Sequence, residues 1–198
     1  MTDTWQADAS TPAEYHAVEA RRGREFILRM TTGADVFLAT QRFAVEQKIR
    51  FAKLHAAFMG GFEPARFLVW TPDTSNPANW HNESEVVVRN LSMVLALGGI
   101  VHPRRHGSGE DPVPAIHFVI GGAWDVPTVG GHLVEGTIVK GVCQFFVTEL
   151  LDIDVLYAGG VAPNAHIEQF PESWYRHVPR DTPTAAPPGT SPRAARDR

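Results

Sequence analysis

The sequence predicts an α+β fold, built mostly from an antiparallel β-sheet with one early helix packed on it. Short apolar runs with alternating or β-branched residues recur along the chain, and glycine pairs or Pro/Asn-rich segments separate them. Only one long segment shows a helical spacing of apolar residues. Strands joined by such turn residues are typical of antiparallel sheets, and 198 residues suffice for one globular domain with a sizeable core.

Each predicted element follows from its local pattern. Residues 25–30 alternate as a first strand, and residues 34–48 carry an apolar stripe at helical spacing, with Asp35 at the N-terminal end. A short helix is expected at residues 13–21, after Pro12, and a loop at 71–82. Further strands are expected at residues 50–62, 66–70, 85–89, 91–101, 114–120, 136–140, 142–153 and 165–170. Alternation in the strand at 50–62 places Leu54, Ala56 and Phe58 on one face, and Lys53, His55 and Ala57 on the other.

The stretch from residue 114 to residue 135 organises the rest of the chain. Its apolar run ends at a glycine pair, and His117 lies on the face of the strand opposite to Phe118. A second glycine pair, Gly130-Gly131, precedes His132 and would let the backbone pass close to a neighbouring strand. We therefore expect His117 and His132 to fold against each other and to share one cavity.

Histidines in such a position indicate a metal site. Zinc prefers imidazole nitrogens and needs at least three protein ligands, so we predict His117 and His132 as ligands, with His102 as a third if its strand pairs antiparallel with that of His117. His55 is a further candidate, and Glu135 could serve as a general base or hold an imidazole in its orientation by a hydrogen bond. The alternative is that the histidines are hydrogen-bonded residues of the core or of an interface.

Sequence motifs of known catalytic sites do not point to an activity. The sequence has no G-x-S-x-G elbow, no P-loop and no dinucleotide fingerprint, so no catalytic residue is assigned and an enzyme is the less favoured hypothesis.

The net charge and the cysteine content limit which other classes of function fit the sequence. The net charge of −4 argues against strong autonomous binding of DNA phosphates, although Arg104, Arg105 and His106 form a basic loop that could contact DNA or another anion. No apolar run is long enough to cross a bilayer, and the first ten residues are polar rather than a signal peptide. The single Cys143 excludes an intrachain disulfide, so we expect a reducing, cytoplasmic location.

Two segments resemble the signature of the PPC (plant and prokaryote conserved) domain family. In that family a P-x-x-H-x-H strand is followed by G-G-H-L-x-E-G; here P-A-I-H at 114–117 fits the first half and G-G-H-L-V-E-G at 130–136 fits the second. Val119 departs from the pattern, because many prokaryotic relatives carry a second histidine there. His102 and His106 are the candidates for the ligand that valine cannot supply.

The resemblance implies a PPC-like domain at residues 24–175, between an N-terminal extension at 1–23 and a disordered Pro/Ala/Arg-rich tail at 176–198. It also implies a homotrimer. Plant members join the domain to an R-G-R-P hook that binds DNA, but here Arg22-Gly23-Arg24 is followed by Glu25, which favours a charged run that enters a strand. We expect a trimeric, cytoplasmic, DNA-associated regulatory protein with a histidine site able to hold zinc. The alternative is a small-ligand- or metal-binding module, or a metal-dependent enzyme, with its pocket between subunits.

Overall fold

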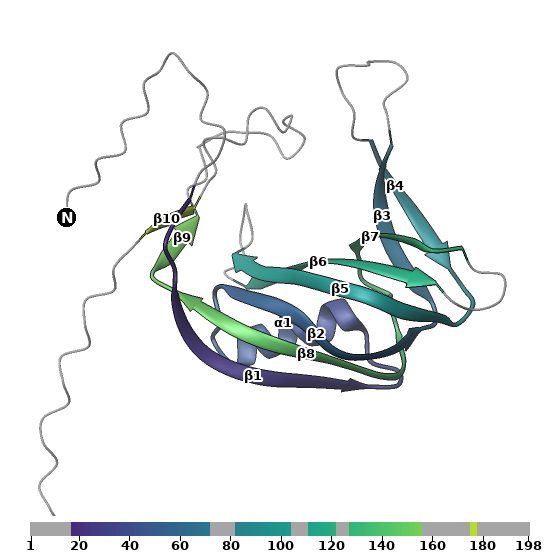
Figure 1. Cartoon of the computed structure of the whole chain (residues 1–198), viewed down its shortest axis with the longest axis horizontal. Coiled ribbons are helices and arrows are strands. Elements are labelled where there is room, and N and C mark those ends of the chain that lie inside the picture. Colours follow the sequence, from purple (N-terminus) through teal and green to yellow (C-terminus); the bar gives the residue numbers. More distant parts are fainter. Residues whose placement is uncertain (1–16, 72–81, 104–110, 122–126, 156–174, 178–198) are drawn as a thin grey trace, which may run out of the picture.

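The described residues form one curved eight-stranded antiparallel sheet, one helix and a separate pair of short strands (Figure 1). The computed structural model describes residues 17–71, 82–103, 111–121, 127–155 and 175–177. The helix is α1 (Val36–Glu46). The strands are β1 (Arg21–Thr31), β2 (Ala52–Phe62), β3 (Ala65–Thr71), β4 (Asn82–Val88), β5 (Ser92–Pro103), β6 (Pro112–Gly121), β7 (Val129–Leu133), β8 (Val139–Leu151), β9 (Ile153–Val155) and β10 (Tyr175–His177). The predicted α+β class is therefore confirmed.

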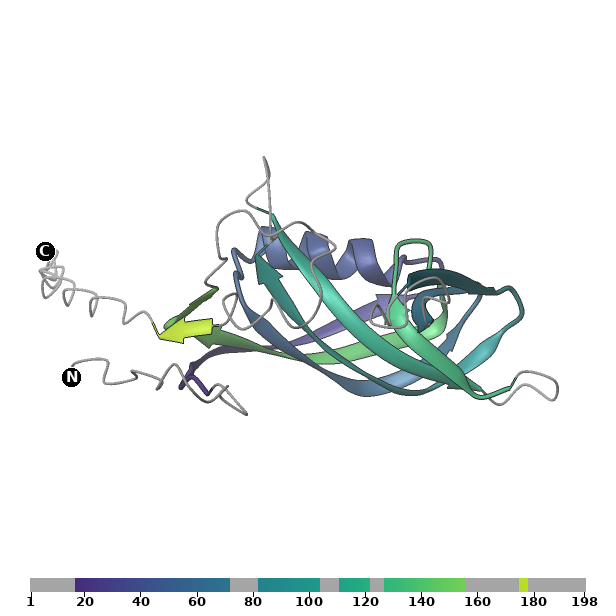
Figure 2. The same cartoon turned by 90° about the horizontal axis from the view of Figure 1, so that it is seen from above.

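Eight of these strands form a single sheet in the order β1-β8-β2-β5-β6-β7-β3-β4, and β9 and β10 form a separate pair. Every pairing is antiparallel, including that of β5 with β6. Helix α1 covers one face of the sheet, which we call the inner face (Figure 2). The opposite side, which we call the outer face, has no helix over it in the described part of the chain.

Local hydrogen bonds fix both ends of α1. Asp35 is the N-cap, and its Oδ1 accepts from the Leu38 N–H at 3.1 Å, which satisfies one of the free donors of the first turn. Its Oδ2 accepts from the Gly136 N–H at 2.7 Å and so ties the helix start to the turn before β8. At the other end, Lys48 takes a positive φ of 54° and the Ile49 N–H closes on the Ala44 carbonyl at 2.8 Å.

The inner face and α1 enclose the core. Phe118 lies at its centre, with edge-to-face contacts to Phe62 and Phe67 at ring-centroid distances of 5.6 and 5.3 Å. Val36 and Ala44 of α1 are buried against the same cluster. The alternation predicted for β6 is confirmed, because Ile116, Phe118 and Ile120 are buried while His117 and Val119 are exposed.

The strict alternation predicted for β2 is wrong beyond Ala56. The pairing of β2 with β8 shifts register between Ala56 and Phe58, so an extra residue stands in the strand there. A β-bulge of this kind exchanges the faces of the residues that follow it. Phe58 therefore leaves the side of Leu54 and is 62% exposed, whereas Leu54 is 2% exposed.

Other sequence predictions about elements differ from the structure or fall outside it. The short helix expected at 13–21 is wrong for its described part, because residues 17–20 are not helical and β1 begins at Arg21. The strands expected at 136–140 and 142–153 are joined in one strand, β8, which begins at Val139 and passes through Gly141 at a φ of 86°, and Ile153 already belongs to β9. Residues 72–81 of the expected loop and the expected strand at 165–170 lie outside the described residues.

Candidate imidazole site on the outer face

The two histidines of the glycine-rich stretch lie against each other. His117 of β6 and His132 of β7 are directly opposite in the antiparallel register, and their ring centroids are 5.0 Å apart at an interplanar angle of 77°. Cross-strand partners point to the same face of a sheet, so both rings stand on the outer face. The juxtaposition is the one that the sequence predicts.

The glycine pair makes this approach possible. A Cβ on Gly130 would lie 2.1 Å from the Phe118 carbonyl oxygen, and one on Gly131 would lie 2.3 Å from the Leu68 carbonyl oxygen. Real Cβ atoms do not come so close to backbone atoms, so only glycine fits at either position. Strand β7 is thereby held tightly between β6 and β3, which fixes where His132 stands.

A hollow of about 250 Å³ lies beside the two rings. It is lined by Leu68, Val69, Trp70, His117, Gly130, Gly131 and His132. Burial lowers the pKa of His132 below its usual value, and the neighbouring His117 and His102 lower that pKa further, while Glu83 opposes them. The lowered pKa favours the neutral form of the His132 ring, in which a ring nitrogen can accept a proton or bind a metal ion.

His102 stands on the same outer face but outside this hollow. It lies opposite Val113, four positions along β5 from Gly98, which is the partner of His117. Its Nδ1 is 2.8 Å from the Pro103 carbonyl oxygen, and burial lowers the pKa of His102.

His55 lies in the same cross-strand row as the pair, on the far side of Gly98. Within the described ranges, no group of three or more His, Cys, Asp and Glu side chains is arranged to hold a metal ion. The structure thus brings together two of the predicted ligands, His117 and His132, in one hollow, and His102 does not line that hollow.

Glu135 belongs to a different hollow. It is exposed in the turn after β7, beside Asp35, Arg66 and Glu85, and it does not line the imidazole hollow. Arg104, Arg105 and His106 fall outside the described residues.

Sequence reasoning missed Trp70, Leu68 and Glu83. Leu68 is the partner of His132 in the pairing of β3 with β7, and Trp70 and Leu68 line the hollow. Glu83 is opposite Trp70 on β4. More than 45 residues of sequence separate these positions from His132, and no local pattern in the sequence links them to it.

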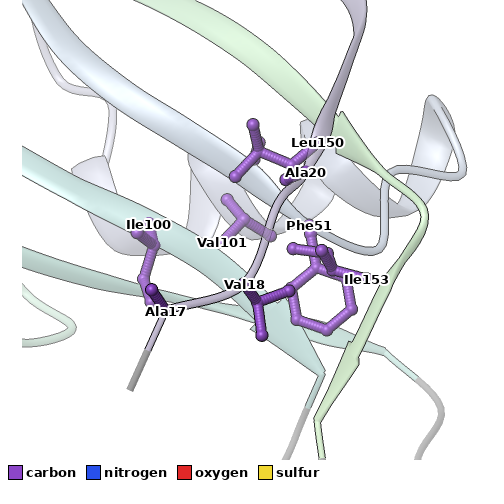
Figure 3. A pocket seen from close by; sticks show the side chains of 9 residues that line it. Ala17, Val18, Ala20, Phe51, Ile100, Val101, Leu150 and Ile153 are labelled. Atoms are coloured by element: carbon purple, nitrogen blue, oxygen red, sulfur yellow. The ribbon is translucent and has the colours of Figure 1, made fainter. Parts of the chain in front are cut away.

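An apolar recess at the other end of the sheet offers no catalytic group. It holds about 410 Å³ between the segment 17–20 and the ends of β2, β5 and β8, and Figure 3 shows its side chains turned toward one another. The lining is entirely aliphatic or aromatic: Ala17, Val18, Ala20, Phe51, Ala52, Ile100, Val101, Leu150 and Ile153. The imidazole hollow is therefore the better candidate for chemistry.

The R-G-R segment is part of the scaffold. Arg22 is paired with Glu25, and the Arg24 guanidinium is bonded to Glu149 and to the Gln47 carbonyl. The interpretation as a charged run that enters a strand fits these contacts.

These features define an α+β protein with a single curved antiparallel sheet and a pair of imidazoles on its outer face. Residues 17–151 match the model of the Plants and Prokaryotes Conserved (PCC) domain, the PPC family of the sequence resemblance. The chain belongs to this family.

Solved structures show the same fold. A PPC protein from Pyrococcus horikoshii is 18% identical, with a TM-score of 0.55 over 69% of this chain and 85% of its own. A metal-containing protein from Archaeoglobus fulgidus is 22% identical, with a TM-score of 0.54 over 69% and 86%. A protein from Bacteroides thetaiotaomicron with the provisional description of DNA-binding protein is 17% identical, with a TM-score of 0.52 over 70% and 90%.

Two further findings are negative. No curated protein matches the sequence. No helix in the described part of the chain is long and apolar enough to span a membrane.

Proposed function

We propose that this chain is a DNA-associated regulatory protein that works as a homotrimer, with the PPC domain as the unit of assembly. The observation that carries the proposal is the family membership, together with the provisional DNA-binding description of the Bacteroides protein. The outer face supports assembly, because large apolar side chains are exposed on it, among them Phe58 at 62% and Phe146 at 47%. Monomeric proteins seldom expose such residues in one large patch.

The DNA contact would be electrostatic and would need the assembled protein. A single chain carries a net charge of −4, and Arg24 is bonded within the fold. Three copies of the loop with Arg104, Arg105 and His106 would place their basic side chains in one assembly, where together they could contact phosphates.

The test is binding of the full chain to labelled duplex DNA at several salt concentrations. Counterion release predicts that affinity falls by about tenfold or more between roughly 50 and 200 mM salt, and that a variant with Arg104, Arg105 and His106 all changed to Gln loses most of it. Arg22→Gln with Arg29→Gln is the matched control, since both arginines are exposed on β1. Absence of DNA binding by an intact trimer would refute the DNA role and leave the assembly standing.

A second candidate is a metal-binding module, and the imidazole pair favours it. His117 and His132 face each other beside an open hollow, and the lowered pKa of His132 favours the neutral ring that a metal ion requires. Zinc needs at least three protein ligands, so the pair supplies two and the third would come from His102, from His106 or from another subunit. The relative from Archaeoglobus fulgidus is described as metal-containing.

Metal analysis of protein purified without a histidine tag tests this candidate. A bound metal should disappear in His117→Ala and in His132→Ala and should persist in His55→Ala, whose ring is in the same row but across Gly98. Equal metal content in all of these proteins would show that the pair is not the site.

A further inference from the structure

The apolar recess at the end of the sheet is a cavity separate from the imidazole hollow, and the two share no lining residue. It holds about 410 Å³, which is within the size range of small-molecule pockets. Its floor is well packed, because Phe51, Ala52 and Val101 are each no more than 3% exposed. The segment 17–20 forms another wall and passes across the strand ends in Figure 3.

The lining of the recess favours an apolar ligand. In the described part of the chain, no lining side chain carries a hydroxyl, an amide or a charge. Apolar cavities in proteins stay dry and bind apolar molecules, and an engineered cavity of about 150 Å³ takes up one benzene. The recess is more than twice as large, so an alkyl chain of roughly ten carbon atoms fits in it.

Two cations at the start of β2 indicate where a polar head group would lie. The Arg50 guanidinium carbon is 5.8 Å from the centroid of the Phe51 ring, which lines the recess. Lys53 is exposed and lies opposite Ile100, another lining residue, in the pairing of β2 with β5. Cross-strand partners stand on the same face of a sheet, so the Lys53 side chain is beside the recess.

The carboxylates near the recess belong to its other walls. Asp152 precedes the lining residue Ile153 and is bonded to Arg21, which offsets its charge. Glu19 is exposed on the segment 17–20. The start of β2 is therefore the side of the recess that attracts an anion, and an amphiphile with an anionic head matches both the lining and the charges.

We propose that the recess binds a medium-chain carboxylate, with its alkyl chain against Phe51, Val101 and Leu150 and its carboxylate beside Lys53. The occupant is a free molecule rather than a bilayer, because the recess is concave and the segment 17–20 forms one of its walls. Such a ligand is distinct from DNA and from a metal ion, and its site uses none of the residues proposed for those roles.

Calorimetric titration of the full chain with hexanoate, octanoate, decanoate and longer carboxylates tests the recess. Each CH₂ that enters it should tighten binding by about two- to fourfold, and the gain should stop once the chain is longer than the recess. Val18→Glu puts a charge into the lining and should weaken decanoate binding by at least about tenfold. Val45→Glu is the matched control, because Val45 is 40% exposed on α1 and does not line the recess.

A second variant fills the recess instead of charging it. Ala20 is exposed and lines the recess, so Ala20→Phe should also weaken decanoate binding by at least about tenfold without placing a charge there. Circular dichroism and urea unfolding show whether each variant is folded, and because Ala20 is exposed this variant keeps the test decisive if Val18→Glu does not fold.

The head group is tested separately. Lys53→Gln should weaken decanoate binding by about two- to fivefold, as expected for an exposed ion pair, and should leave the binding of neutral 1-decanol unchanged. Lys140→Gln is the control, because Lys140 lies at the far end of β8 and is paired with Glu63. Equal losses for decanoate and 1-decanol in Lys53→Gln would overturn the assignment of the carboxylate.

The remaining outcomes name other occupants. Absence of decanoate binding by the full chain, or binding that persists in both Val18→Glu and Ala20→Phe, would overturn the proposal. Binding that appears only after removal of residues 1–16 would assign the recess to that segment, and sedimentation with anionic vesicles that is lost in Val18→Glu would assign it to a membrane. Weaker self-association of Val18→Glu, without decanoate binding by the wild type, would assign it to a second copy. The assay with duplex DNA is independent of each of these results.

Discussion

Arg24 and Glu149 form a two-point ion pair that joins the start of β1 to the end of β8. The distances are 2.7 Å from Nε to Oε2 and 3.0 Å from Nη2 to Oε1, and the Arg24 N–H also donates to Oε2 at 3.3 Å. The second Nη2 bond, to the Gln47 carbonyl at 2.8 Å, adds the end of α1 to the same junction. Glu149 is 8% exposed, so its charge depends on such donors.

Arg24→Met should lower the free energy of unfolding by about 1–3 kcal/mol, because a nearly buried carboxylate loses charge-assisted hydrogen bonds. The loss of stability should be smaller than for a fully buried ion pair, since the arginine side chain is 49% exposed. Urea denaturation measures it. Arg22→Met is the control, because the Arg22–Glu25 pair lies at the surface and its loss should leave the midpoint close to that of the wild type.

Gly130→Ala should destabilise the domain by about 1–3 kcal/mol or prevent folding, because the new Cβ would lie 2.1 Å from the Phe118 carbonyl oxygen. Gly98→Ala is a matched change in the same sheet, and its Cβ would meet only the Leu54 carbonyl oxygen, at 3.7 Å. The thermal unfolding temperature of Gly98→Ala should therefore be close to that of the wild type, and that of Gly130→Ala should be far lower. Equal transition temperatures would contradict the close approach of β7 to β6.

The stability of the domain should fall between about pH 7.5 and pH 5.5. Burial lowers the pKa of His132 and of His102, so the unfolded chain, whose histidines titrate near pH 6.5, binds more protons than the folded one as the pH drops through that value. The stabilisation that comes from burying these two neutral imidazoles is complete at pH values above the pKa of the unfolded chain. It is lost as the pH falls toward the lower pKa of the folded protein. His132→Gln should show a shallower decline in urea midpoints than the wild type.

Cys143 should resist thiol reagents in the native protein. Burial raises its pKa to about 12, so almost no thiolate forms at pH 8, and its Sγ lies 4.0 Å from the Met59 sulfur inside the fold. Ellman's reagent should react only as fast as the chain unfolds, and fully in urea. Complete reaction of the native protein within seconds would show that the thiol is accessible.

The sequence predicted the fold class and the facing imidazoles because both depend on local signals. Alternation within β6 and the glycines before His132 are visible in a few residues each, and together they fix a hairpin-like contact. The walls of the hollow could not be found in that way. Trp70 and Leu68 reach it through the pairing of β3 with β7, which depends on the packing of the whole sheet.

The separation of His102 from the pair has a similar cause. The prediction of His102 as a ligand depended on an antiparallel pairing of β5 with β6, which is observed, but the register places His102 opposite Val113 near the start of β6. Register is set by turn geometry and by burial along both strands, and a single sequence does not reveal it. Glu135 was placed by its nearness in sequence to His132, and the turn after β7 carries it to another hollow.

The extra residue in β2, at Ala57, decides which side chains of the rest of that strand face outward. Were the strand regular here, with Ala57 itself paired to Gln144, each later position would trade sides: Phe58 would lie opposite Cys143 and turn inward, and the thioether of Met59 would turn toward water. No side chain in that stretch would change its chemistry, yet the sheet would show its surroundings a different surface. The bulge at Ala57 therefore decides which surface this part of the sheet presents, independently of the chemistry of any one residue in it.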